Sequence, residues 1–317
     1  MKSMADRLRA LVQSGGLNLP LPGAGDTRAR WHALSEISRS NVVLGRLAEA
    51  HCDALAILDE LGGPASQPGR IWGVWAAEPP VPVVDATETS EGWVLNGVKP
   101  WCSGASSCTD ALITARTPVG RALFAVDLGK PWAKPLANTW HAVGMAESDS
   151  GAVEFTDADA TLVGSPGAYL DRPGFWHGAI GVAACWFGGA CGVADILHRH
   201  VRAGRGDEHT AAHLGAVAAL LHTARASLDT AADAIDADPA DRLGTSRIRA
   251  RSVRAVVEMS ATGVLDRVGR ALGAAPLCSD PAHAQRVADL TVYLRQSHAE
   301  RDLAELGHDL EGLEHPW

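Results

Sequence analysis

Positive charge is scarce in this sequence, and so are the smaller aromatic residues. Its 317 residues include 28 Lys and Arg against 37 Asp and Glu, a formal net charge of -9. This balance disfavours a nucleic-acid backbone or an anionic membrane as the main partner. Only two Tyr and four Phe stand beside ten Trp. That bias toward the largest flat ring indicates that some Trp residues stack on a ligand, whereas the alternative is that they fill the core.

Paired cysteines and a secretory leader are also missing. None of the six cysteines lies in a CxxC pair, and the amino-terminal segment MKSMADRLRA has no apolar stretch of the kind that a signal peptide contains. We therefore expect free, mostly buried thiols in a cytoplasmic protein. With 46% hydrophobic and 21% charged residues, the composition is typical of a folded globular protein.

The common catalytic signatures are absent as well. The chain has no GxGxxG after a strand, no Walker loop, no GxSxG elbow and no HExxH, which disfavours the usual dinucleotide, NTPase, hydrolase and zincin classes. His209 and His213 would share one face of a helix, but no clear third ligand accompanies them. We therefore expect no metal site.

One segment is long and apolar enough to cross a bilayer. Residues 174–194 contain no Asp, Glu, Lys or Arg and carry two GxxxG spacings. Against a membrane span stand His177, six glycines that keep the hydrophobicity modest, and Asp195 directly after the segment. We expect a buried central helix.

The spacing of apolar residues divides the chain into three parts. Up to residue 69 they recur at helical intervals, from 70 to about 168 the pattern changes to short β runs, and from 169 onward helices return. We predict an α+β fold. Its parts are a short N-terminal helical domain (1–69), a middle β-barrel or sandwich domain (70–168) and a C-terminal helical bundle (169–317).

Local signals predict the individual elements. The pair Asn96-Gly97 predicts a type I′ hairpin turn between strands at 92–95 and 98–101. Further strands are predicted at 111–116, 122–128 and 152–155. Helices are predicted near 174–203, 208–236, 247–272 and 281–306.

Four motifs in the middle of the chain resemble those of the acyl-CoA dehydrogenase superfamily. They are WAAEPP at 75–80, NGVKPWCSGASSCTDALITAR at 96–116, VGMAESDSGAVEF at 143–155 and LVGSPG at 162–167. The family has TEP, NGxKxWITNA followed by AD, GMRxSxT with a later F, and LLGxxG in this order. The resemblance covers about 70–317 and implies FAD between the β domain and the C-terminal helices. It also implies assembly as a homodimer or tetramer.

The resemblance points to particular cofactor-binding residues. Trp101, Cys102 and Ser103 match the strand end that faces the flavin, where an indole forms a flat wall behind the ring and a hydroxyl donates to flavin N5. The backbone at Ala77 and Glu78 matches the segment at the flavin edge, with Ala77 in place of the usual Thr.

Other segments depart from the family pattern. The RxxFG segment that reaches the FAD pyrophosphate is replaced by HVRAGRGDEH, in which Arg202 or Arg205 is the candidate contact. The GGxG loop at the adenine end is reduced to ALGA, which contains Gly273. The N-terminal helical domain is shorter than in the family, so part of the pocket wall is absent or comes from another chain.

The catalytic base is the largest departure. Dehydrogenation of an acyl thioester needs a carboxylate to remove the α-proton, and the two positions that the family uses for Glu match Ser297 and Val182. His298 is the titratable group closest to the first position, and Glu300 follows it. A His at this position resembles the pattern in the flavin monooxygenase branch of the superfamily. His298 and Glu300 are therefore the candidate catalytic residues.

Three functions stay open from the sequence. The first is an FAD-dependent oxidoreductase that oxidises a CH–CH bond of a CoA thioester or a related small acyl substrate. The second is a flavin-dependent monooxygenase of the same superfamily. The third is a catalytically silent subunit or binding module of a hetero-oligomer, which the missing Glu and the short N-terminal domain favour.

Overall fold

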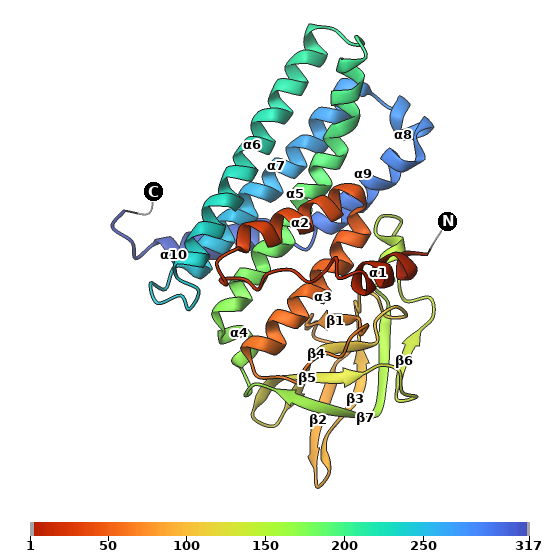
Figure 1. The fold of residues 1–317 in the computed structure, drawn as a ribbon, viewed down its shortest axis with the longest axis vertical. Coiled ribbons are helices and arrows are strands. Elements are labelled where there is room, and N and C mark those ends of the chain that lie inside the picture. Colours follow the sequence, from red (N-terminus) through yellow and green to blue (C-terminus); the bar gives the residue numbers. More distant parts are fainter. Residues whose placement is uncertain (1–2, 316–317) are drawn as a thin grey trace. The chain divides into compact units, whose positions relative to one another are not determined.

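The computed structural model describes residues 3–315, which fall into two compact units (Figure 1). Unit 1 takes the residues up to Leu19, Arg46–Ala142 and Ala146–Phe175. Unit 2 takes Pro20–Gly45, Val143–Met145 and the residues from Trp176 onward. The predicted partition into three domains stays a prediction, since these units divide the amino-terminal helices between them.

Unit 1 contains all the strands found within residues 3–315. Its elements are α1 (Met4–Gln13), most of α3 (Val42–Glu60), β1 (Trp72–Trp75), β2 (Val84–Thr89), β3 (Gly92–Lys99), β4 (Asp110–Thr117), β5 (Gly120–Asp127), β6 (Ala133–Leu136), the 3-10 turn η1 (Ala146–Ser148), β7 (Ala152–Val163) and α4 (Ala168–Asp171). The strands form one seven-stranded sheet in the order β1-β4-β2-β3-β7-β5, with β6 on β7. Because β5 also pairs with β4, the sheet closes on itself as a barrel.

Alternating side chains of the barrel strands serve two cores. In β4, Ile113 points into the interior cluster with Phe124 and Phe155, whereas Leu112 points outward. Leu112 packs in a second cluster that includes Ile57 of α3. This period-two alternation covers both faces of the strand with apolar side chains and accounts for the nearly continuous hydrophobic sequence of β4.

The hairpin predicted at Asn96-Gly97 is wrong. Strand β3 runs without a break through this pair, and its antiparallel neighbour is β2, joined to it by residues 90–91. The pair instead marks an irregularity in the pairing with β7, where the register shifts between Leu95 and Gly97. Gly97 has a φ of 127°, and a Cβ there would lie 2.3 Å from the carbonyl oxygen of Val83. The glycine therefore permits a bulge and a close strand approach rather than a turn.

Unit 2 is helical. It contains α2 (Thr27–Ser40), most of α5 (Pro173–Arg202), α6 (Glu208–Ala237), α7 (Ser246–Leu272), α8 (Ala275–Ser279), α9 (Pro281–Leu294) and α10 (Glu300–Leu310). Helices α5, α6 and α7 agree with the predicted positions within one residue. The last predicted helix, 281–306, is wrong as one element: it breaks at 295–299, where Ala299 has a φ of 49°.

Helix α5 is the predicted central helix. Among residues 3–315 it is the one helix long and apolar enough to cross a membrane, and 78% of its most apolar window is buried. The hydroxyls of Ser35 and Ser38 on α2 donate to carbonyl oxygens of α5 at 2.9 and 2.7 Å. A Cβ at Gly188 would lie 2.0 Å from the Ser35 carbonyl oxygen. One GxxxG spacing of α5 therefore serves close helix packing within the chain.

Candidate functional site

Trp101 is an exposed indole held in a left-handed backbone conformation. It follows the end of β3, is 56% exposed and has a φ of 56°. For a bulky residue this conformation is rare and costs about 1 kcal/mol or more. Packing within the chain offsets little of that cost, because more than half of the residue faces solvent. A strained, exposed flat ring indicates a contact surface for a ligand or another molecule.

The two residues after Trp101 turn inward. The Cys102 thiol is buried in the barrel core, where it donates to the Lys99 carbonyl oxygen at 3.2 Å and burial raises its pKa. A ligand would meet the backbone of Cys102 rather than its sulfur, and the N–H of that backbone donates to the Gly151 carbonyl oxygen. Ser103 is 7% exposed, and its carbonyl oxygen accepts a hydrogen bond of 3.0 Å from the Trp75 indole.

The Ser103 side chain belongs to a chain of three buried hydroxyls. Its Oγ lies 2.9 Å from Ser150 Oγ, which lies 2.8 Å from Ser148 Oγ. Each hydroxyl can donate one hydrogen bond and accept two, so the chain can orient its protons in either direction. The sequence interpretation missed Ser148 and Ser150, although both lie inside the motif VGMAESDSGAVEF and could have been found there.

Backbone hydrogen bonds hold together the two loops that carry these hydroxyls. The N–H of Gly104 donates to the Ser148 carbonyl oxygen at 2.8 Å, and that of Ala105 donates to the Asp149 carbonyl oxygen at 3.1 Å. The Asp149 carboxylate accepts from the Ser106 N–H at 2.8 Å. The positions of the hydroxyls are thus set by the backbone before any ligand binds.

Glu78 is engaged in a charge cluster inside unit 1. The Lys99 ammonium is 2% exposed and donates to Glu78 Oε1 at 2.5 Å, to the Thr114 carbonyl oxygen at 2.7 Å and to Thr114 Oγ1 at 2.8 Å. The Thr114 hydroxyl also donates to Glu78. Burial lowers the pKa of Lys99, and its hydrogen bond to Glu78 opposes that shift. The cluster ties the segment after β1, including Ala77, to β3 and β4.

The two candidate catalytic residues lie in unit 2, at the break between α9 and α10. The His298 side chain is 66% exposed, with Nδ1 3.2 Å from Asp302 Oδ1, and its backbone N–H donates to Asp302 Oδ2 at 2.9 Å. Glu300 is the exposed first residue of α10. Both side chains are exposed, and the assignment of a base to them stays a prediction.

Arg205 and Gly273 lie at the other end of the bundle. Arg205 is exposed between α5 and α6, and Gly273 ends α7 with a φ of 63° (Figure 1). The segment with His298 contacts α7 through the ion pair of Arg295 with Glu258, at 2.5 Å. At 1.5 Å per residue, Glu258 lies about 22 Å along the helix from Gly273. The candidates in unit 2 therefore form two separate groups, with His298 and Glu300 in one and Arg205 and Gly273 in the other.

The two histidines considered as metal ligands in the sequence lie near the start of α6. His209 and His213 are both within this helix. Within residues 3–315, no group of three or more His, Cys, Asp and Glu side chains is arranged to hold a metal ion.

Solved structures share this architecture over nearly the whole chain. Dibenzothiophene monooxygenase TdsC from Paenibacillus sp. A11-2 has 19% sequence identity and a TM-score of 0.77, and the match covers 97% of this chain and 95% of that one. Glutaryl-coenzyme A dehydrogenase in complex with glutaryl-CoA has 17% identity and a TM-score of 0.81, with coverages of 96% and 86%. The chain has the acyl-CoA dehydrogenase fold.

A third structure with this fold is the 3-HSA hydroxylase from Rhodococcus sp. RHA1, at 18% identity and a TM-score of 0.80, with coverages of 98% and 90%. No protein-family model and no curated protein matches the sequence. The predicted α+β architecture is confirmed, and the resemblance seen in the four motifs is confirmed at the level of the fold.

Proposed function

We propose that this protein is a flavin-dependent oxidoreductase of the acyl-CoA dehydrogenase type, with Trp101 as the wall of its flavin site. The observation that carries this proposal is the exposed, left-handed Trp101 beside the hydroxyl chain that starts at Ser103. These are the flat surface and the hydrogen-bond donor that a flavin ring needs. The fold adds support, because one structure of TdsC contains FMN and indole.

The residues of unit 1 fit a bound flavin in distinct ways. When bound, the flavin supplies a hydride acceptor at N5. The Trp101 indole would exclude water from one side of the ring, and the Ser103 hydroxyl would donate to N5. Ala77 and Glu78 would contribute backbone groups, since the Glu78 carboxylate is held by Lys99. We take FAD as the cofactor on the strength of the motif resemblance, with FMN as the alternative.

The proposed substrate is an acyl thioester or a related small acyl compound, oxidised at a CH–CH bond. His298 is the proposed base, with Glu300 as its alternative, and Arg205 and Gly273 are the proposed contacts to the far part of FAD. A flavin monooxygenase is the second candidate function. The observation that favours it is the absence of an acid at both Ser297 and Val182.

Absorption spectroscopy tests the cofactor first. Titration of the purified protein with FAD and FMN should give flavin bands that shift on binding. Trp101→Ala should weaken binding about fivefold, the equivalent of about 1 kcal/mol of aromatic stacking. Val119→Ala is the matched control, because Val119 is an exposed apolar residue of unit 1 in the β4–β5 turn. A protein that takes up neither flavin, even with partner subunits, would overturn the proposal.

Two assays then separate the candidate reactions. Anaerobic bleaching of the flavin by CoA thioesters indicates a dehydrogenase, and oxygen consumption with a supply of reduced flavin indicates a monooxygenase. A chain that binds flavin but does neither would favour the third candidate, a catalytically silent subunit or binding module of a hetero-oligomer. We further propose that the protein acts in the cytoplasm as a homodimer or tetramer, which light scattering at micromolar concentration tests.

A further inference from the structure

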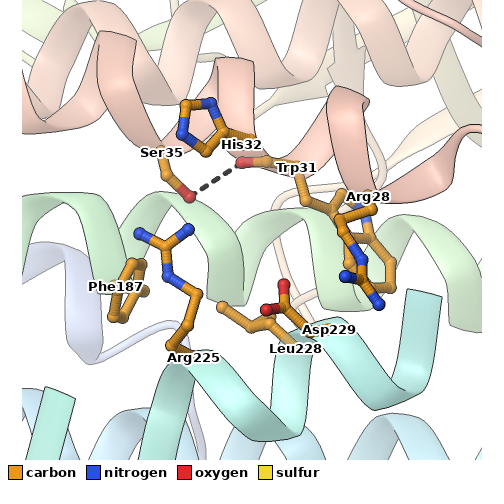
Figure 2. A pocket seen from close by; sticks show the side chains of 8 residues that line it. All are labelled: Arg28, Trp31, His32, Ser35, Phe187, Arg225, Leu228 and Asp229. Carbon is orange, nitrogen blue, oxygen red and sulfur yellow. Dashed lines mark hydrogen bonds between the residues drawn. The ribbon is translucent and has the colours of Figure 1, made fainter. Parts of the chain in front are cut away.

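A cavity of about 100 Å³ lies among α2, α5 and α6, wholly within unit 2 (Figure 2). Its lining comes from one face of α2, at intervals of three and four residues, from one residue of α5 and from one face of α6. The lining residues are Arg28, Trp31, His32, Ser35, Phe187, Arg225, Leu228 and Asp229.

The cavity has an apolar floor and a polar rim. Trp31, Phe187 and Leu228 are buried, each at most 4% exposed, whereas Arg28 and His32 are exposed. A cavity of 150 Å³ accommodates benzene, so about 100 Å³ accommodates about four non-hydrogen atoms, with room for a longer ligand toward the rim. The site therefore suits a small molecule with an apolar part.

Arg225 is a preorganised but unused donor in this cavity. Its guanidinium lies over the Phe187 ring, 4.6 Å from the ring centroid, and has no hydrogen bond or ion pair with any residue between 3 and 315. Figure 2 shows the guanidinium directed toward Ser35, away from the Asp229 carboxylate on the same helix. Stacking fixes the plane of the guanidinium and leaves its fork of N–H donors free for a planar, bidentate acceptor.

Trp31 contributes its ring to the cavity, whereas its indole nitrogen lies beside Gly181 of α5, which does not line the cavity. Trp31 is 3% exposed, and its indole Nε1–H has no hydrogen-bond partner within the described part of the chain. A buried donor without a partner costs about 1–3 kcal/mol. Arg28, by contrast, is paired with Asp233 at 2.5 Å. Arg225 therefore supplies the free N–H donors that the cavity offers to an acceptor.

We propose that this cavity binds the carboxylate group of a small organic acid, with the Arg225 guanidinium as its principal partner. A carboxylate matches the planar fork of Arg225, and its short apolar body fits the floor formed by Trp31, Phe187 and Leu228. Asp229 disfavours a dianion such as phosphate, because like charges repel in a partly buried site. The proposal uses residues of unit 2 alone and does not depend on the proposed flavin site.

Calorimetric titration of the full chain tests the proposal, with acetate, propionate and inorganic phosphate at matched ionic strength. We expect saturable binding of the carboxylates and weaker binding of phosphate. Arg225→Gln should weaken carboxylate binding about tenfold or more. Asp229→Asn should tighten it about fivefold, since a repelling charge is removed. Arg270→Gln, which changes an exposed arginine of α7, should leave it unchanged.

The opposite signs of the two cavity variants keep the test decisive. A fold defect in Arg225→Gln would abolish binding for an unrelated reason, but no fold defect would make Asp229→Asn bind more tightly. Absence of saturable heat with either carboxylate overturns the proposal. Phosphate binding at least as tight as that of acetate overturns it as well, and so does unchanged acetate affinity in both cavity variants.

Discussion

The Oγ atoms of Ser103 and Ser150 lie 2.9 Å apart, and both side chains are buried. Ser103 follows β3, whereas Ser150 precedes β7, so the contact joins two loops that are separated by 47 residues. Ser148 extends the contact to a third hydroxyl. Because Ser103 is the proposed donor to flavin N5, the direction in which it points its proton depends on whether Ser150 donates or accepts.

Ser150→Ala should therefore affect both stability and flavin binding. It removes the hydroxyl that contacts both Ser103 and Ser148, which should lower the free energy of unfolding by about 1–2 kcal/mol in urea denaturation. Ser103→Ala removes the proposed donor itself and should weaken flavin binding more than Ser150→Ala does. Equal flavin affinity in the wild type and Ser103→Ala would remove Ser103 from the site, whatever the effect on stability.

Variants of Trp101 test whether the strained backbone at this position is retained because the ring binds flavin. Trp101→Gly relaxes the left-handed backbone, so the free energy of unfolding should stay level or rise by about 1 kcal/mol, while flavin binding weakens. Trp101→Ala removes the same ring but keeps a Cβ at a φ of 56°, so it should weaken flavin binding without that gain. Thermal unfolding and flavin titration of both variants supply the comparison. A large loss of stability in Trp101→Gly would show that the ring supports the fold instead.

In the charge cluster of Lys99, removal of one charged partner should cost more stability than removal of both. Lys99→Met leaves the Glu78 carboxylate with the exposed Arg121, 3.9 Å away, as its one remaining cation within residues 3–315, and it should lower the free energy of unfolding by about 3 kcal/mol. The double variant Lys99→Met with Glu78→Gln should recover much of this loss, because no uncompensated charge remains. Denaturation in urea measures both. Additive losses in the double variant would contradict the coupling.

Helices were easier to predict from this sequence than strand pairing. The positions of α7 could be predicted because Val253, Val257, Val264 and Val268 recur at helical spacing, and all four are buried. The break between α9 and α10 depends on Ala299, whose residue type gives no signal for a positive φ.

The local sequence could not decide whether the Asn96-Gly97 pair forms a turn or a bulge. The same dipeptide suits a tight turn and a bulge, and what decides here is the approach of the Val83 carbonyl oxygen to Gly97. The cavity of unit 2 escaped prediction for a similar reason. Its two arginines, Arg28 and Arg225, lie almost 200 residues apart, and only the packing of α2 on α6 brings them together.

Buried His283 should make the protein less stable as the pH falls. It lies in the first turn of α9, is 4% exposed, and its Nδ1 has no hydrogen-bond partner within residues 3–315. Burial lowers the pKa of His283 from its usual 6.5, the charges of Arg286 and Arg199 act in the same direction, and Asp280 opposes them.

The unfolded chain keeps the usual histidine pKa, so below about pH 6.5 it binds a proton that the folded chain binds less readily. The free energy of unfolding should therefore fall as the pH drops through 6.5 toward the lowered pKa of the folded state, and this contribution should vanish above about pH 7. His283→Gln, which cannot be protonated there, should flatten that part of the profile in urea denaturation between pH 5 and 8. The same slope in His283→Gln and the wild type would assign the pH dependence to other groups.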